Sequence, residues 1–213
     1  YALDTNTTGE YNVAIGYAAM DANTTGGYNT GVGYHALKSN TTGTGLVAIG
    51  AYALDAISSA ADNSVAIGYE ALSAHTAAQP SVAVGRGALK SNVTGQYNVA
   101  VGDRALQDNT ANFNTAMGGF ALYKNTTATH NVAFGYAALE QNTTGGNNTA
   151  VGHSALQKNT TADNNTAVGF QALEENTTGT QNEAFGYTTM SANTTGNYNA
   201  AFGALAAVSL NGG

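Results

Sequence analysis

The sequence predicts an all-β fold, a parallel β-solenoid (β-roll) of about twelve coils with 17 residues each. Three observations predict this fold. A glycine recurs at a nearly constant interval, the residues before it alternate as in a β-strand, and an Asn-Thr-Thr-Gly segment with turn-forming chemistry separates the copies. A helical alternative fails, because this much Gly, Asn and Thr would destabilise any helix.

The repeat is anchored on the glycine that ends segments such as Asn12–Gly16 (NVAIG). This anchor glycine occurs at Gly16, Gly33, Gly50, Gly68, Gly85, Gly102, Gly118, Gly135, Gly152, Gly169, Gly186 and Gly203. Nine of the intervals are 17 residues long, one is 18 (Gly50 to Gly68) and one is 16 (Gly102 to Gly118). We therefore expect residues 1–213 to form a single continuous repeat array with no linker and no second domain.

The segment before the anchor glycine is predicted to be the strand that stacks. Val13 and Ile15 would share one face, and Ala14 would take the other. The residue directly before the glycine is large and apolar in every copy, so we predict that it forms the structural core. These residues are Ile15, Val32, Ile49, Ile67, Val84, Val101, Met117, Phe134, Val151, Val168, Phe185 and Phe202. The residue before them is Ala, or Gly31 in one copy, which indicates a close neighbour: the opposite wall of the coil or another chain.

The rest of each coil is a return segment and a corner. The return segment, Tyr17–Met20 in the first copy, is predicted to be a second short strand or extended piece that ends in a column of Leu or Met. The corner, Asn6–Gly9, has side chains that bond locally to the backbone. A single coil cannot bury its apolar face, so coils would stack about 4.8 Å apart and form ladders of Asn, Thr and Tyr. Glu183 replaces Val or Thr three residues before the glycine, so that column is not strictly buried.

Two segments carry a family resemblance. Asn63–Leu72 (NSVAIGYEAL) and Asn12–Met20 (NVAIGYAAM) resemble the head repeats of trimeric autotransporter adhesins. The longer form of the repeat, NTTGxxNTAVGYxAL, is similar to repeats of phage and bacterial fibre proteins. The resemblance covers essentially the whole chain, although the period is longer here than is usual in the adhesin heads. It implies a left-handed β-roll, a homotrimer, binding to host surfaces, and an extracellular location on a virion fibre or a cell surface.

Composition excludes several partners. The net charge is −7 with 6 Lys and Arg residues, so no basic patch is expected for nucleic acid or for an anionic membrane. No apolar run approaches the roughly 20 residues of a spanning helix, so no membrane insertion is expected. The chain has no cysteine, which excludes disulfides and thiolate metal sites.

No catalytic, metal or cofactor site is predicted. The four histidines, His35, His75, His130 and His153, fall in different columns of the repeat, so stacking does not bring them together as ligands. The nearest carboxylate candidates for hydrolysis are Glu174 with Glu175, and Glu140 near Glu175. They occupy columns that hold Lys in other coils, which indicates solvated positions, and we expect no enzyme activity.

Aromatic columns are the candidate contact residues. Tyr17, Tyr34, Tyr69, Tyr136 and Tyr187 follow the anchor glycine, and Tyr11 and Tyr28 precede the strand. They could contact a sugar or a protein, or pack between chains or against a neighbouring turn. The Asn-x-Thr sequons at Asn6, Asn23, Asn40, Asn92, Asn125, Asn142, Asn159, Asn176 and Asn193 are explained by turn chemistry without any glycan.

The sequence therefore favours a structural and adhesive fibre module that contacts a receptor or a glycan through surface ladders. One alternative is a self-assembling extracellular filament whose uncapped coils join end to end. A third hypothesis is an ice-binding solenoid that uses ladders of Thr.

Overall fold

A computed structural model describes residues 1–57, 63–76 and 79–208. It divides into two compact units, Tyr1–Arg104 (unit 1) and Ala105–Gly213 (unit 2), and each unit is described by itself. The boundary falls in the copy of the repeat whose glycine interval is 16 residues. A single continuous array over both units stays a prediction of the 17-residue period.

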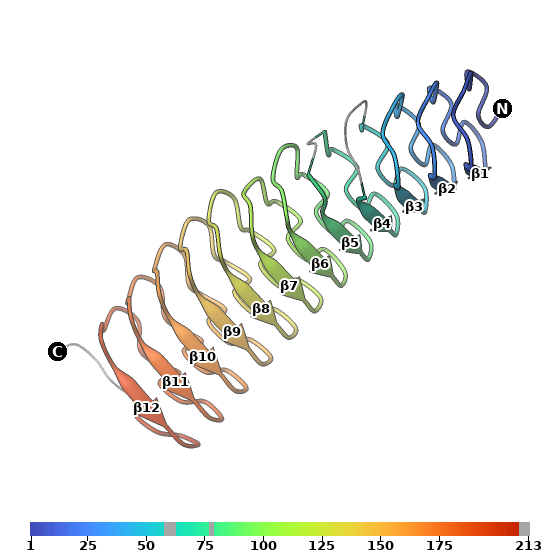
Figure 1. Cartoon of the computed structure of the whole chain (residues 1–213). Coiled ribbons are helices and arrows are strands. Elements are labelled where there is room, and N and C mark those ends of the chain that lie inside the picture. The colour runs from blue at the N-terminus through green and yellow to red at the C-terminus, as the bar shows by residue number, and fades with distance from the viewer. Residues whose placement is uncertain (58–62, 77–78, 209–213) are drawn as a thin grey trace. The chain divides into compact units, whose positions relative to one another are not determined.

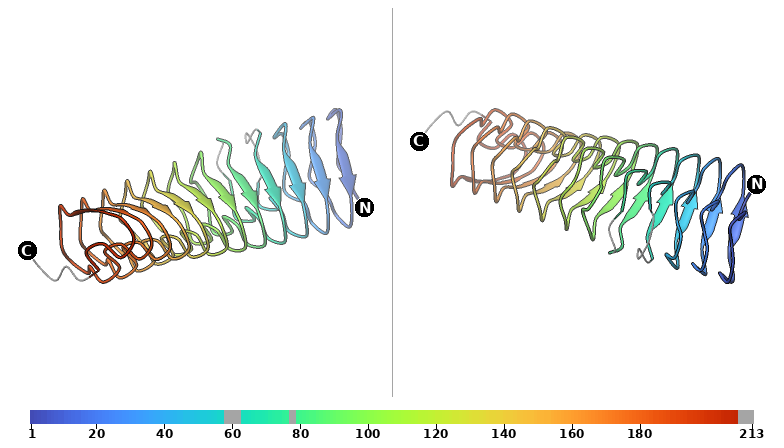
Figure 2. Two further views of the ribbon diagram at one scale, coloured as in Figure 1. Left: turned by 90° about the horizontal axis from the view of Figure 1, so that it is seen from below. Right: turned by 90° about the horizontal axis from the view of Figure 1, so that it is seen from above.

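Each unit is a stack of coils, and every coil contributes one short strand to a parallel sheet (Figure 1). Unit 1 contains β1 (Val13–Ile15), β2 (Thr30–Val32), β3 (Val47–Ile49), β4 (Val65–Ile67), β5 (Val82–Val84) and β6 (Val99–Val101). Unit 2 contains β7 (Thr115–Met117), β8 (Val132–Phe134), β9 (Thr149–Val151), β10 (Thr166–Val168), β11 (Glu183–Phe185) and β12 (Ala200–Phe202). Figure 2 shows that the strands of each unit lie along one side of its coils, and that loops close the other sides. The predicted all-β parallel solenoid is confirmed.

The strands pair in the register of the repeat. Ile15 is the partner of Val32 in unit 1, and Ala150 is the partner of Ala167 in unit 2. Within each unit, this parallel register places identical positions of the repeat above one another, so a single column of residues runs along the stack. The predicted ladders of Asn, Thr and Tyr follow directly from it.

The inside of each coil is filled by small residues of the strand and by the Leu column of the return segment. Ala48 and Ala150, at the centres of β3 and β9, are completely buried, and so are Leu37 and Leu156 from the opposite wall. Met20 takes the Leu position in the first coil, and a Cβ added to Gly31 would lie 2.9 Å from its Cγ. The longer Met side chain thus occupies the space that an alanine would need. The close neighbour of the small column is therefore the opposite wall of the coil.

The prediction that the residue before the anchor glycine forms the core is wrong. Ile15, Ile49, Ile67, Phe134 and Phe202 are exposed, and Val32, Val84, Val101, Met117, Val151, Val168 and Phe185 are half-buried. Successive side chains of a strand point to opposite faces, so one of the two sets must face outward. The side chains of the Leu column leave room inside the coil for a methyl group only. The inward-facing residue of the strand is therefore Ala.

The prediction of a second strand in the return segment is also wrong. Residues 34–39 form a chain of turns, in which Leu37 has a φ of 53° and His35 a φ of 59°. Alternate amides bond locally and to the next coil: Lys38 N–H donates to His35 O (3.3 Å), and Leu37 N–H donates to Ala53 O (3.0 Å). A β-branched side chain is strongly disfavoured at positive φ, which explains why this column holds Leu or Met, with Ala207 in one coil, and never Val or Ile.

The corners are held by a ladder of buried asparagines. Asn142 Nδ2 donates to Asn125 Oδ1 (2.9 Å) and to Gly145 O (2.9 Å), and Asn159 Nδ2 donates to Asn142 Oδ1 (2.9 Å). We call the residues in this position, seven after the anchor glycine, the corner column. They include every predicted sequon asparagine except Asn6, which precedes the first anchor glycine, and all of the sequon asparagines in the column are completely buried. The amide nitrogens are therefore committed to the fold, as the turn interpretation of the sequons requires.

His75 interrupts the corner column in unit 1. It is completely buried, Asn92 Nδ2 lies 3.3 Å from its Nδ1, and its Nε2 has no hydrogen-bond partner. The corresponding residue of the preceding coil is Ile57, which is also completely buried and offers no polar group. Burial lowers the pKa of His75, and the nearby backbone of Asn92 and Gln79, which favours the protonated ring, opposes that shift only in part.

The lowered pKa of His75 makes unit 1 sensitive to acid. The unfolded chain binds a proton at His75 as the pH falls below about 6.5, whereas the folded chain resists this proton, so the free energy of unfolding decreases. We expect His75→Asn, which restores the asparagine ladder, to reduce the loss of melting temperature between pH 7.5 and 5.5. His130→Asn is the matched control, because His130 is exposed and has the positive φ (60°) that Asn accepts. Equal acid sensitivity of the wild type and His75→Asn would contradict this account.

Candidate functional site

The most extensive candidate surface is the outward side of the strands. We call the residues three and one before the anchor glycine the outer strand face. In unit 1 they are Val13, Ile15, Thr30, Val32, Val47, Ile49, Val65, Ile67, Val82, Val84, Val99 and Val101. In unit 2 they are Thr115, Met117, Val132, Phe134, Thr149, Val151, Thr166, Val168, Glu183, Phe185, Ala200 and Phe202. All of them are exposed or half-buried.

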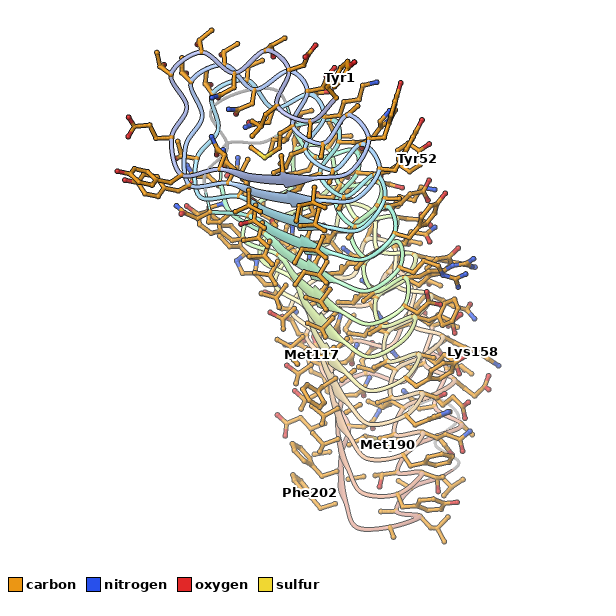
Figure 3. The ribbon with its side chains drawn as sticks, turned by 90° about the vertical axis from the view of Figure 1, so that its right-hand side faces the viewer. Tyr1, Tyr52, Met117, Lys158, Met190 and Phe202 are labelled. Atoms are coloured by element: carbon orange, nitrogen blue, oxygen red, sulfur yellow. The ribbon has the colours of Figure 1, made fainter. Side chains whose placement is uncertain are left out.

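The outer strand face is apolar over long runs of coils. In unit 1 it consists of Val and Ile with the single exception of Thr30. In unit 2 it carries larger side chains: Phe185 and Phe202 stack with ring centroids 5.0 Å apart and an interplanar angle of 4°. Phe202 projects from its strand away from the inside of the coil (Figure 3). Contiguous apolar surface of this kind marks a binding or assembly surface in soluble proteins.

Aromatic columns lie just outside the strands. In unit 2 the column that follows the anchor glycine stacks continuously, from Tyr136 to His153 (5.3 Å), Phe170 (5.3 Å) and Tyr187 (5.3 Å). In unit 1 Tyr17 stacks on Tyr34 at 5.3 Å. The rings in these stacks turn their faces toward one another, so the edges and the polar groups are what reach the solvent.

In unit 1 the column of residues that directly follow the anchor glycines changes its ring geometry at Ala51, which is not aromatic. Tyr52, the next residue, reaches the space between the coils and contacts Tyr34 (5.3 Å, 67°) and Tyr69 (6.2 Å, 87°) edge-on. His35 stacks on Tyr34 at 4.0 Å. Aspartate Asp55, in the same coil as Tyr52, has its pKa raised by burial. Tyr34, Tyr52 and Tyr69 therefore form one cluster on the side of unit 1.

The candidate contact tyrosines are all accessible. Tyr11, Tyr17, Tyr28, Tyr34, Tyr69, Tyr136 and Tyr187 are exposed. Their rings pack against aromatic rings of neighbouring coils in the same chain, as one of the two interpretations of the sequence predicted. Their role in binding stays a prediction.

The charged residues pair across neighbouring coils. Arg86 binds Asp103 through two bonds of 2.8 and 2.9 Å, and Lys158 Nζ binds Glu175 at 2.6 Å. The Arg86 guanidinium lowers the pKa of Asp103, and Glu175 raises the pKa of Lys158. These pairs are on the surface, where solvent screens the charges and each pair adds little to stability. Arg86 and Asp103 directly follow their anchor glycines, and Lys158 and Glu175 directly precede the corner asparagines, so the two pairs lie at different positions of the repeat.

The carboxylate candidates are separate surface groups with partners of their own. Glu140 accepts a bond from Gln157 (2.6 Å), Glu174 accepts one from Gln171 (3.1 Å), and Glu175 is paired with Lys158. Within residues 1–57, 63–76 and 79–208, no group of three or more His, Asp and Glu side chains converges as a metal site would require. The same part of the chain contains no helix long and apolar enough to cross a membrane.

Sequence reasoning overlooked the outer strand face as a surface, because it placed the larger side chains inside. One signal pointed to the right answer: Glu183 shares a face with Phe185, and a charged residue there is tolerated only if that face is accessible. Comparison with protein-family models, with curated proteins and with solved structures finds no match to this chain.

Proposed function

We propose that the chain is a structural and adhesive module of an extracellular fibre, in which copies of the chain associate through the outer strand face. The observation that carries this proposal is the exposure of large apolar side chains along that face, such as Ile15 (60%), Phe134 (53%) and Phe202 (66%). Leaving such a stripe in water is unfavourable by about 25 cal/mol per Å² of apolar area. A second copy offers the same stripe with the same spacing, so the surface is complementary to itself.

The number of copies in the proposal is three. It follows from the resemblance of the repeats to trimeric adhesin heads, and the geometry of one chain is compatible with it. In a homotrimer each outer strand face packs against those of two partners and forms a shared apolar core. The coils then supply length and rigidity, because backbone bonds join neighbouring coils and the corner column adds side-chain bonds wherever it holds asparagine.

Contact with a receptor or a glycan is assigned to the exposed tyrosines. Tyr17, Tyr69 and Tyr187 stand beside the strands on a rigid backbone, and amphipathic aromatic rings of this kind are common in recognition surfaces. If this assignment is right, Tyr69→Ala lowers binding to intact cells or immobilised glycans and leaves the mass of the assembly unchanged.

The assembly is tested by measuring the molar mass in solution. We expect light scattering to give three times the chain mass of 21.5 kDa over a wide range of concentrations. Val32→Lys combined with Ile49→Lys places two charges on the outer strand face and should weaken association at least a hundredfold, because a buried unpaired ion costs several kcal/mol. Thr25→Lys combined with Thr42→Lys is the matched control, since both threonines are exposed at corners of the same coils.

The same measurement separates the alternatives. A monomeric wild-type chain would overturn the assembly proposal. A polymer that sediments and grows with concentration would favour the end-to-end filament. The ice-binding hypothesis has less support, because in many corners the hydroxyl of the first Thr donates to the next coil, for example Thr24 to Thr41 O (3.0 Å) and Thr143 to Thr160 O (2.9 Å).

A further inference from the structure

Two pairs of tyrosines in unit 1 are stacked in register between the first two coils. Tyr11 and Tyr28 have ring centroids 4.9 Å apart and an interplanar angle of 21°. Tyr17 and Tyr34 have centroids 5.3 Å apart and an angle of 12°. Each pair occupies one position of the repeat in adjacent coils, which the pairing of β1 with β2 aligns.

The backbone holds the first pair in place while the rings stay open to solvent. Tyr28 N–H donates to Glu10 O (3.0 Å), and both residues have nearly the same φ, 59° for Tyr11 and 60° for Tyr28. The side chains are 70% and 68% exposed, respectively. Two phenol rings are thus kept within reach of each other and within reach of a dissolved oxidant.

The geometry points to oxidative cross-linking of Tyr11 with Tyr28, and of Tyr17 with Tyr34, as dityrosine. A haem peroxidase and hydrogen peroxide supply the oxidation. Each phenol loses one electron and one proton, the two radicals join through a bond between ring carbons next to the hydroxyls, and the displaced ring protons move to the phenol oxygens. One H₂O₂ accepts the two hydrogens and becomes two water molecules, so the protein loses two hydrogen atoms per cross-link.

The consequence is a covalent bond between two coils in a chain that contains no cysteine. A cross-link between the first two coils restricts the unfolded chain in the way a disulfide does. The ladder of unit 2 is arranged differently, because His153 and Phe170 separate Tyr136 from Tyr187.

The test treats the full chain with hydrogen peroxide and a haem peroxidase and digests it with a protease that cleaves before aspartate. Cleavage before Asp21 separates Tyr11 and Tyr17 from Tyr28 and Tyr34. We expect the two peptides to remain joined in single-chain material, with a mass lower by two hydrogens per cross-link and with dityrosine fluorescence. Tyr28→Phe combined with Tyr34→Phe should reduce the joined peptide at least tenfold.

Tyr198→Phe is the matched control, because Tyr198 lies in the same column as Tyr28, is exposed, and has Gln181 in the neighbouring coil. It should leave the yield unchanged. Circular dichroism confirms that the variants are folded. Absence of the joined peptide in the wild type, its persistence in the double variant, or cross-links formed only between chains would each overturn the inference. None of these outcomes depends on whether the chain is a trimer.

Discussion

Gly68→Ala is expected to destabilise unit 1 by about 3–5 kcal/mol, from backbone strain and overpacking together. Gly68 is an anchor glycine with a φ of 137°, a conformation that other residues rarely adopt. A Cβ added to it would lie 2.5 Å from Gly85 O and 2.6 Å from Gly85 C. Since these are backbone atoms of the next coil, neither can move aside without breaking the stack.

Urea denaturation measures this effect, and Gly27→Ala is its control. Gly27 lies in the same unit, a Cβ there would lie 3.1 Å from Glu10 O, and its φ is outside the left-handed region. We expect Gly27→Ala to change the free energy of unfolding by about 1 kcal/mol or less. Similar losses for the two variants would show that the anchor glycines are not required by close backbone approach.

Asn142→Ala is expected to destabilise unit 2 by about 2–4 kcal/mol. The change removes the donor of Asn125 Oδ1, the donor of Gly145 O, and an acceptor of Asn159 Nδ2. All three asparagines are completely buried, so water cannot replace the lost bonds without opening the corner.

Thermal and urea unfolding of Asn142→Ala should be compared with Thr144→Ala. Thr144 lies two residues further along the same corner and is exposed, so its loss should change stability by roughly 0.5 kcal/mol or less. A corner column that merely fills space would tolerate Asn142→Ala as well as it tolerates Thr144→Ala, and this result would refute the role of the ladder.

Both predictions concern positions that the repeat pattern already marked. The anchor glycine recurs in every coil and the corner asparagine in most coils. Turn chemistry correctly placed the corner at Asn-Thr-Thr-Gly. The pattern also placed the twelve strands correctly, because Val-Ala-Ile and most of its variants alternate larger side chains, many of them β-branched, with a small residue in period two. Parallel stacking then followed, since coils of equal length pair in register.

The return segment could not be predicted as turns from its letters. Ala18, Met20 and Leu37 have positive φ values, which none of these residue types prefers. This conformation is imposed by the bonds that alternate between the local turn and the next coil. A sequence read one coil at a time carries no information on those bonds.

For this protein, the sequence by itself determined the period, the parallel stacking, the position of the strands and the corners, and the columns that must be glycine or small. Only the tertiary structure decided which side of the strand faces inward. A period-two pattern is compatible with either face of the strand pointing into the coil. The pattern alone therefore does not say whether Ala14 or Ile15 faces inward. The choice depends on volume: Leu and Met side chains from the opposite wall fill the coil and leave space for Ala. The large apolar residues therefore face outward, where they form the surface that the proposed fibre uses for assembly.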